Sequence, residues 1–382
     1  GPARSDPART QRCPTWGATQ GISIAVRSAA CDRGASLAEL GPSIERVRGL
    51  WMESIILLAS GLRRASQKAL ASLDVMARSL GDHAAQGSAC FGRTISLTKL
   101  DRFEAAEEAA EAGLVHAPWM GAFEYVGMTS RVGLVQMLTG HLTRSVTWTR
   151  RALDRARPDV DNRLLSVVRD TLAVQLAILG RPNDGEERFS KLLGEEVWTN
   201  GRVQVGLGMG LFHCYETGND GPLVEALLRA HQTSAVSPSH VADEELVQYL
   251  MAAYIHARRA LAGTTRSRGD LAGSLRPVRT IARWRMFRAH LPVLEAAALL
   301  VDGRPEKALA RLEVAERLAR EDDNPWATFE AIAMRVRAYV RLGYERDARL
   351  HLRMALALAE EQRWTRRDAR LRAELGRLLD RD

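Results

Sequence analysis

The chain of 382 residues is poor in cysteine and lacks long apolar segments. Its four cysteines, Cys13, Cys31, Cys90 and Cys214, are too few and too scattered for a disulfide scaffold, so we expect a reducing, cytoplasmic location. No run of about 18 apolar residues occurs, which predicts no membrane-spanning helix. Phosphate-binding loops, a Gly-x-Ser-x-Gly elbow, kinase motifs and paired metal-ligand motifs are also absent. We therefore expect no enzyme activity, no metal and no cofactor in this chain.

The overall composition is that of a folded protein with a positive net charge. Hydrophobic residues make up 46% and charged residues 26% of the chain, which excludes a disordered polypeptide. The net charge is +8, and it comes from arginine, since only four of the 54 basic residues are lysine (Lys68, Lys99, Lys191 and Lys307).

The first 42 residues differ from the rest in being rich in proline and glycine. We predict a weakly ordered arm over residues 1–42. Gly1 and Pro2 resemble the remnant left by a tag-removing protease, and the predicted fold does not depend on them. A kinase, ATPase or DNA-binding domain could precede this region in a longer protein.

Beyond residue 42, apolar residues recur at spacings of three and four, which is typical of amphipathic helices. Two segments forty residues apart share one pattern. Gly303 and Gly343 are each followed by alanine after five residues, leucine after nine and alanine after twelve. Glycine at such a turn allows one helix to end and the next to begin, and the small residues let the two helices pack closely.

The same phase continues upstream, so that a period of about forty residues runs through most of the chain. The other predicted turns lie at Gly61, Leu100, Gly140, Gly180, Gly221 and Gly263. A single helical hairpin cannot bury its apolar face alone, and such units therefore stack on their neighbours. We predict about eight hairpins over residues 43–361 and a C-terminal cap helix over residues 362–382.

This pattern resembles the tetratricopeptide repeat (TPR) family, in a long variant with a period of about 40 rather than 34 residues. It is similar to the C-terminal repeat regions of bacterial Ser/Thr kinases, STAND ATPases and maltose-regulator-like activators. The resemblance implies an all-α, right-handed α-solenoid. It also implies a non-catalytic scaffold or sensor region of a bacterial signalling or regulatory protein, which binds a protein or peptide in its concave groove.

The charge of the chain is concentrated in one window, from Arg258 to Arg288. Nine arginines and a single acid, Asp270, give this window +8, the net charge of the whole chain. Its candidate binding residues are Arg276, Arg279, Arg283, Trp284 and Arg288, and helical spacing predicts a common face for the first three. They would bind an acidic peptide, a phosphate group or a nucleic acid. In the alternative interpretation, these arginines form ion pairs with acids of adjacent units, such as Glu295, Glu313 and Glu316.

The resemblance also implies groove residues outside this window. In the last unit, Arg337 and Arg341 would face the concave groove, and in the unit before the basic window Tyr249 and His256 would lie on or near it. We expect an acidic protein or peptide as partner. Two alternatives remain open: a nucleic-acid-associated regulator that uses the Arg258–Arg288 patch, and an enzyme whose site lies unrecognised between helices.

One further motif, Gly206-x-Gly208-x-Gly210, lies within a predicted helix rather than after a strand. A phosphate-binding loop requires a strand before it and a helix after it. We interpret the three glycines as sites where neighbouring helices approach closely.

Overall fold

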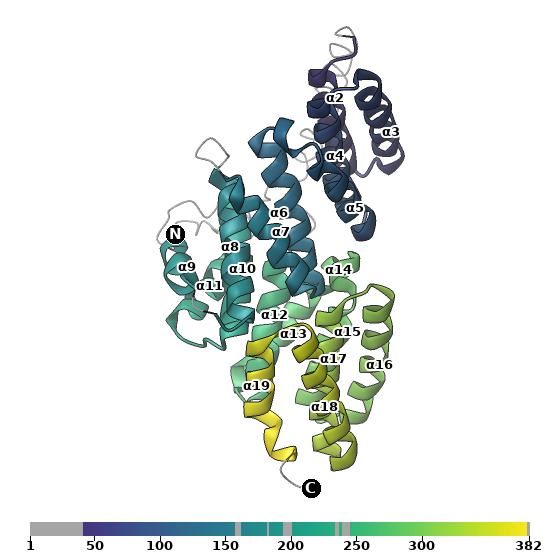
Figure 1. Ribbon diagram of the computed structural model, residues 1–382. Helices are drawn as coiled ribbons and strands as arrows, with labels where there is room; N and C mark the ends of the chain where they lie inside the picture. Colours follow the sequence, from purple (N-terminus) through teal and green to yellow (C-terminus); the bar gives the residue numbers. More distant parts are fainter. Residues whose placement is uncertain are drawn as a thin grey trace, which may run out of the picture. The chain divides into compact units, whose positions relative to one another are not determined.

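The computed structural model describes residues 41–156, 162–181, 183–193, 201–233, 237–238 and 245–379, with no side-chain description for 162–163, 201–204 and 265–267. Residues 1–40, and with them most of the predicted N-terminal arm, lie outside the described residues. The described part is helical and contains no strand, in agreement with the predicted all-α class (Figure 1). No helix in this part is both long and apolar enough to cross a membrane.

The chain divides into two compact units. The first comprises the described residues up to Ser96 and the segment Glu111–Met120, and the second comprises Leu97–Ala110 and everything from Gly121 onward. Helices α4 and α5 contribute residues to both. The helices that lie wholly or partly in the first unit are α2 (Ile44–Ala59), α3 (Arg63–Leu80), α4 (His83–Lys99) and α5 (Phe103–Leu114).

The first unit has a small core between α2, α3 and α4. Trp51 and Phe91 meet edge to face with their ring centroids 4.9 Å apart. Gly92 permits this contact, because a Cβ at that position would lie 2.3 Å from the Cβ of Trp51. Beside the rings, the hydroxyl of Ser54 bonds to those of Ser66 and Ser96 at 2.9 and 3.1 Å, which gives each of these three buried hydroxyl groups a partner.

The second unit consists of an inner and an outer layer of helices. The inner helices are α6 (Ala122–Thr139), α8 (Asn162–Ile178), α10 (Gly201–Thr217), α12 (Val247–Leu261), α15 (His290–Val301) and α17 (Pro325–Leu342). Each is followed by an outer partner: α7 (Leu142–Asp154), α9 (Gly185–Leu193), α11 (Pro222–Thr233), α13 (Thr265–Ile281) with the short α14 (Arg285–Arg288), α16 (Pro305–Glu321) and α18 (Glu345–Glu361). Helix α19 (Thr365–Leu375) and a 3-10 turn (Gly376–Leu378) complete the unit.

The turns between inner and outer helices follow the predicted period. Positive φ angles occur at Gly61, Gly140, Gly180, Gly263, Gly303 and Gly343, as the sequence predicts. Two turns are displaced from the predicted residue: the turn expected at Leu100 has its left-handed residue at Asp101, and the turn expected at Gly221 has it at Gly218. Aspartate tolerates this conformation better than most residues because its short polar side chain bonds locally.

Helix ends within the second unit have local causes in the sequence. Asn324 caps α17, since its side chain accepts a hydrogen bond from the backbone N–H of Ala327 at 2.9 Å. Pro325 at the first helical position costs no hydrogen bond there. Gly343 ends the same helix in the left-handed conformation.

The inner helices of the second unit close on themselves. Contacts run from α6 through α8, α10, α12 and α15 to α17, and α17 contacts α6 again. Gly140 makes this last contact possible, because a Cβ there would lie 2.5 Å from the backbone nitrogen of Trp326. Helix α19 contacts α8 and α10 as well as α18. Segments about 180 residues apart in the sequence therefore pack together.

Aromatic side chains fill the space that the inner helices enclose. Trp326 stacks on Phe212 at 4.8 Å between ring centroids and lies 4.5 Å from His290. Tyr254 continues the cluster, and its hydroxyl bonds to Nδ1 of His290 at 2.7 Å. At this level the inner face is a packed core rather than an open groove.

The three glycines of α10 occupy close helix contacts, which confirms their interpretation. A Cβ at Gly206 would lie 2.7 Å from a methyl group of Leu192, and a Cβ at Gly208 would lie 3.0 Å from the backbone nitrogen of Gln248. Because α10 touches α8, α9, α11 and α12, it has little room for side chains. The motif therefore serves packing.

Candidate functional site: an arginine-lined cavity

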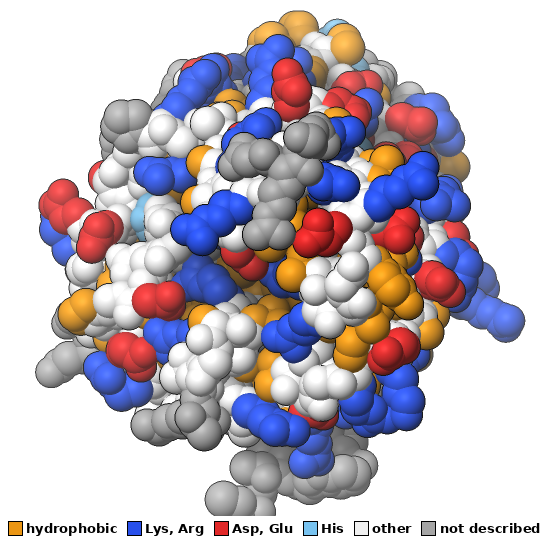
Figure 2. Space-filling view, turned by 90° about the horizontal axis from the view of Figure 1, so that it is seen from below, with side chains coloured by type: hydrophobic (Ala, Val, Ile, Leu, Met, Phe, Trp, Pro, Cys, Tyr) orange, Lys and Arg blue, Asp and Glu red, His pale blue; other side chains and the backbone are white. Residues whose placement is uncertain are grey.

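A cavity of about 400 Å³ lies beside the aromatic core, between the C-terminal parts of α10, α12 and α17 and helix α19. Seen from below, this side of the molecule is hollowed, and basic, acidic and apolar side chains meet in the hollow (Figure 2). The charged groups of the lining are Arg258, Arg337, Arg341, Arg370, Glu330 and Glu374. Four arginines against two glutamates leave the lining with a surplus of two positive charges.

The position of α19 depends on an ion pair buried beside the cavity. The guanidinium of Arg367 bonds to both carboxylate oxygens of Glu216, with distances of 2.5 to 3.1 Å. The two side chains are only 1% and 0% exposed. Trp326 and Trp364 lie against the same guanidinium, 5.2 and 4.6 Å from its central carbon. These contacts fix α19 against α10 and α17.

Arg370, one turn further along α19, joins the cavity to the core. Its Nη1 donates to the backbone oxygen of Tyr215 at 3.1 Å, and its Nη2 lies 3.7 Å from the carboxylate of Glu330. The same carboxylate accepts hydrogen bonds from the Tyr215 hydroxyl at 2.9 Å and from the Trp326 indole at 3.3 Å. Burial, with the charge of Glu330 second, raises the pKa of the Tyr215 phenol, which therefore remains a hydrogen-bond donor.

At the open side of the cavity, Arg337 and Glu374 form a second ion pair. The guanidinium donates two hydrogen bonds to the carboxylate, at 2.7 and 2.5 Å. Burial alone would raise the pKa of Glu374, but the charge and hydrogen bonds of Arg337 outweigh it and hold this pKa below its ordinary value. Glu374 is thus ionised at neutral pH and neutralises Arg337.

The two other arginines, Arg258 and Arg341, have no carboxylate partner from the lining itself. Arg341 is exposed at the end of α17 and donates to the backbone oxygen of Leu300. Arg258 donates to the backbone oxygen of Tyr215 at 3.2 Å and to Asp220, outside the cavity, at 2.8 Å. Its Nε is buried without a hydrogen-bond partner in the described part of the chain. Arginines suit this place because helix C-termini present unpaired carbonyl groups.

The chemistry of these groups suits the binding of an anion. Arginine remains charged throughout the physiological pH range and presents several fixed donors to a carboxylate or phosphate. The phenols of Tyr215 and Tyr254 are kept protonated by burial, which raises the pKa of each. Among the described residues no cluster of His, Cys, Asp or Glu could hold a metal ion.

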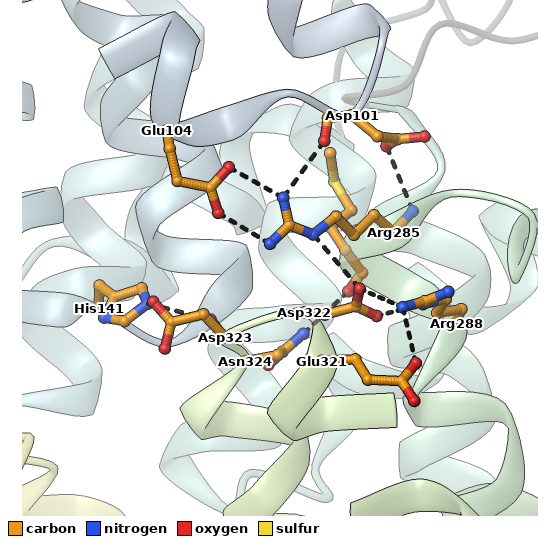
Figure 3. A network of polar contacts seen from close by, with 10 residues as sticks. Asp101, Glu104, His141, Arg285, Arg288, Glu321, Asp322, Asp323 and Asn324 are labelled. Carbon is orange, nitrogen blue, oxygen red and sulfur yellow. Dashed lines mark hydrogen bonds and ion pairs between the residues drawn. The ribbon is translucent and has the colours of Figure 1, made fainter. Parts of the chain in front are cut away.

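The basic window from Arg258 to Arg288 proves to be largely paired with acids. Arg285 and Arg288 belong to the network in Figure 3, where Arg285 donates to both oxygens of Glu104 at 2.9 and 2.8 Å. Asp322, with a side chain only 1% exposed, accepts from both arginines. Arg288 also contacts Glu321 at 3.3 Å. This predicted binding residue therefore has two acidic neighbours within the protein.

Further pairs occupy other arginines of the window. Arg259 contacts Asp220 and Glu225, and Arg268 contacts Asp302. The acids of the alternative interpretation were partly identified: Glu295 is a partner, 3.4 Å from Arg279, whereas Glu316 pairs with Arg335 instead. The side chain of Arg266 lies outside the described residues.

Three of the predicted residues, Arg276, Arg279 and Arg283, remain exposed. Arg276 and Arg279 belong to α13, but this helix ends at Ile281 and Arg283 lies beyond it. The predicted common helical face is thus limited to the first two. Arg283 lies over the ring of Trp284, at 5.7 Å from its centroid, and Trp284 is half-buried.

Two of the four predicted groove residues line the cavity, and the other two are buried elsewhere. Arg337 and Arg341 line the cavity together with Arg258. Tyr249 and His256 do not line it, and they are only 5% and 6% exposed. Tyr249 packs edge-on against His231, with ring centroids 5.0 Å apart, as part of the contact between α11 and α12.

Sequence reasoning missed Tyr215, Glu330, Arg370 and Glu374 in the cavity lining. The last two lie on α19, within the segment predicted as the C-terminal cap helix. A signal was available, since Trp364, Arg367 and Leu371 follow the spacing of one helical face, and the apolar members mark that face as packed.

No family model matches the chain, and a search of curated proteins found no match.

Proposed function

We propose that this chain is a non-catalytic binding region, a tightly wound right-handed α-solenoid of TPR-like hairpins, which recognises an acidic segment of a partner protein. The observation that carries this proposal is the arginine-lined cavity on the inner side of the second unit. Of the four residues that the TPR resemblance assigns to the groove, Arg337 and Arg341 line this cavity, while Tyr249 and His256 do not. Such a region fits a scaffold or sensor of a bacterial signalling or regulatory protein.

The arginines of the cavity indicate that the partner segment is negatively charged. An acidic segment would gain charge-assisted hydrogen bonds to Arg341 and Arg258, which are stronger than those between neutral groups. The exposed arginines Arg276, Arg279 and Arg283 would add longer-range attraction and speed the encounter.

The nucleic-acid alternative has less support. Phosphate backbones are bound by surfaces with many unpaired basic groups. In the Arg258–Arg288 patch, six of the nine arginines contact an acid of the same chain, and three of these six contact two, so most of its charge is already neutralised.

Selection from a random peptide display library tests the proposal, with the purified chain as bait and a salt concentration of about 100 mM. Enrichment of sequences rich in Asp and Glu is the expected result. The charge-reversed variant Arg258→Glu/Arg341→Glu should lose this enrichment, while Arg346→Glu, on the outer helix α18, should retain it. Enrichment of basic or uncharged sequences would contradict the proposal. Binding of a single-stranded or duplex oligonucleotide that falls steeply with salt would favour the alternative.

A further inference from the structure

The arginines of the cavity differ in how many hydrogen-bond and ion-pair partners they have within the protein. Arg337 is matched by Glu374, and Arg370 by Glu330 and the backbone of Tyr215. Arg341, by contrast, has only the backbone oxygen of Leu300 as a partner among the described residues, and Nε of Arg258 has none. Arg341 therefore has the donors that are most available to a new anion, while Arg258, whose Nη2 already bonds to Asp220, contributes its Nε.

Most of the remaining lining is apolar. Leu261, Val340 and Leu375 form part of this wall, and none of the three is fully buried. Phe329, which also lines the cavity, is held by the core, because it packs edge-on against Trp364 with the ring centroids 5.6 Å apart. The volume of about 400 Å³ is in the range of pockets that enclose a small organic molecule or a few side chains. An acidic ligand without an apolar part would leave this wall in contact with water.

Building on the function proposed above, we infer that the cavity recognises a carboxylate carried next to a large apolar group. The carboxylate binds Arg341 and Arg258, and the apolar group packs against Leu261, Val340 and Leu375. Glu374 limits the affinity, because its negative charge lies in the same lining as the incoming carboxylate.

This ligand chemistry has two possible sources. One is an Asp or Glu beside a large apolar residue within a partner chain, and the other is a free organic acid with an aromatic or aliphatic body. Both present the same pair of groups, and they differ in whether peptide backbone follows on either side.

Isothermal titration calorimetry with the complete chain tests the inference, using three probes of equal charge. They are acetyl-Asp-Phe-amide, acetyl-Asp-Ala-amide and 4-phenylbutanoate. We expect the Phe dipeptide to bind at least about tenfold more tightly than the Ala dipeptide, since a buried aromatic ring contributes that much. If the aromatic acid binds as tightly as the Phe dipeptide, the ligand chemistry is supported and a free organic acid suffices; weaker binding of the acid identifies the peptide as the source.

Variants assign the roles of the charged residues. Arg341→Gln and Arg258→Gln should each weaken binding of the Phe dipeptide about tenfold, as expected for a lost charged contact. Glu374→Gln should tighten it about threefold, and Arg346→Gln should have no effect. Circular dichroism identifies any variant that fails to fold.

Equal affinities for the two dipeptides, or unchanged affinity in Arg341→Gln, would overturn the inference. The outcome for the proposed function is separate. If these probes fail while longer acidic peptides bind through Arg341 and Arg258, the apolar requirement is wrong and the proposed function survives. If no acidic ligand binds at all, both are wrong.

Discussion

At the scale of single residues, contacts between buried polar side chains hold together helices of the second unit that are far apart in the sequence. Arg367 and Glu216 are buried together, and each satisfies the charge of the other. His290 is wholly buried and bonds to Tyr254 through Nδ1. Neither role can be predicted from local sequence, because the partners are 151 and 36 residues apart. From composition alone, an arginine such as Arg367 in a highly charged final helix is expected on the solvent-exposed face, whereas it is buried.

Removal of one partner of the buried ion pair should be costly. In Arg367→Met, Glu216 is left as an uncompensated buried charge, and we expect a loss of about 3–5 kcal/mol in the free energy of unfolding. Urea titration followed by circular dichroism measures this loss. The matched change Arg372→Met, at an exposed site on the same helix, should cost less than about 0.5 kcal/mol. Equal costs at the two sites would show that the Arg367–Glu216 contact contributes little.

Stability should decrease in mild acid because of His290. Burial, with Arg367 second, lowers the pKa of this imidazole to about 3 from its ordinary value of 6.5. The unfolded chain therefore takes up a proton below pH 6.5 that the folded chain does not, and stability is lost as the pH falls from 6.5 towards 3.

At pH 5.5 this contribution is about 1.4 kcal/mol, one pKa unit below the ordinary value. His290→Gln removes it, so the variant should lose less free energy of unfolding between pH 7.5 and 5.5 than the wild type. Urea titrations at the two pH values measure the difference. An identical loss in both proteins would refute this assignment.

At the scale of elements, the sequence predicts the helices and their turns well. The glycine-centred period identifies the turns at Gly140, Gly180, Gly263, Gly303 and Gly343, because only a residue without a side chain adopts a left-handed conformation freely. It locates the turns at Leu100 and Gly221 less well, since Asp101 and Gly218 carry the left-handed conformation instead. The end of α13 at Ile281 was also missed, which separates Arg283 from the arginines that it appeared to join.

Two turn glycines should respond differently to the same change. Gly303 and Gly140 both have positive φ, so alanine costs about 1–2 kcal/mol at each through backbone strain. At Gly303 nothing lies within 4 Å of an added Cβ, whereas at Gly140 the Cβ would be 2.5 Å from the backbone of Trp326. Gly140→Ala should therefore lower the free energy of unfolding more than Gly303→Ala in urea titrations. An equal loss would argue against close packing of α6 on α17.

The exposed arginines near α13 should contribute to partner binding. Changing Arg276, Arg279 and Arg283 together to Glu reverses three charges on the surface and should weaken association with an acidic partner while leaving helicity unchanged. The association rate should fall most, because these charges act before contact. Surface plasmon resonance measures the association and dissociation rates. An unaltered association rate would show that these three arginines have no part in binding.

At the scale of the second unit as a whole, the sequence does not predict that the last helices pack against the first ones. The period predicts stacking of neighbouring hairpins, but the contact of α17 with α6 and that of α19 with α8 depend on how far each hairpin rotates relative to the last. That closure places a packed aromatic core where an open groove was expected, with the arginine-lined cavity beside it. It also explains why Arg337 and Arg341 line a cavity while Tyr249 and His256 are packed elsewhere.

The cavity is the central claim of the account, and the most direct measurement is the affinity of one acidic, Phe-containing peptide for three proteins: the wild type, Arg258→Gln/Arg341→Gln and Arg346→Gln. Fluorescence anisotropy at about 100 mM salt gives each Kd. We predict that the double variant binds at least about a hundredfold more weakly than the wild type, and that Arg346→Gln binds as the wild type does. Equal affinity in all three proteins would contradict a binding role for the cavity.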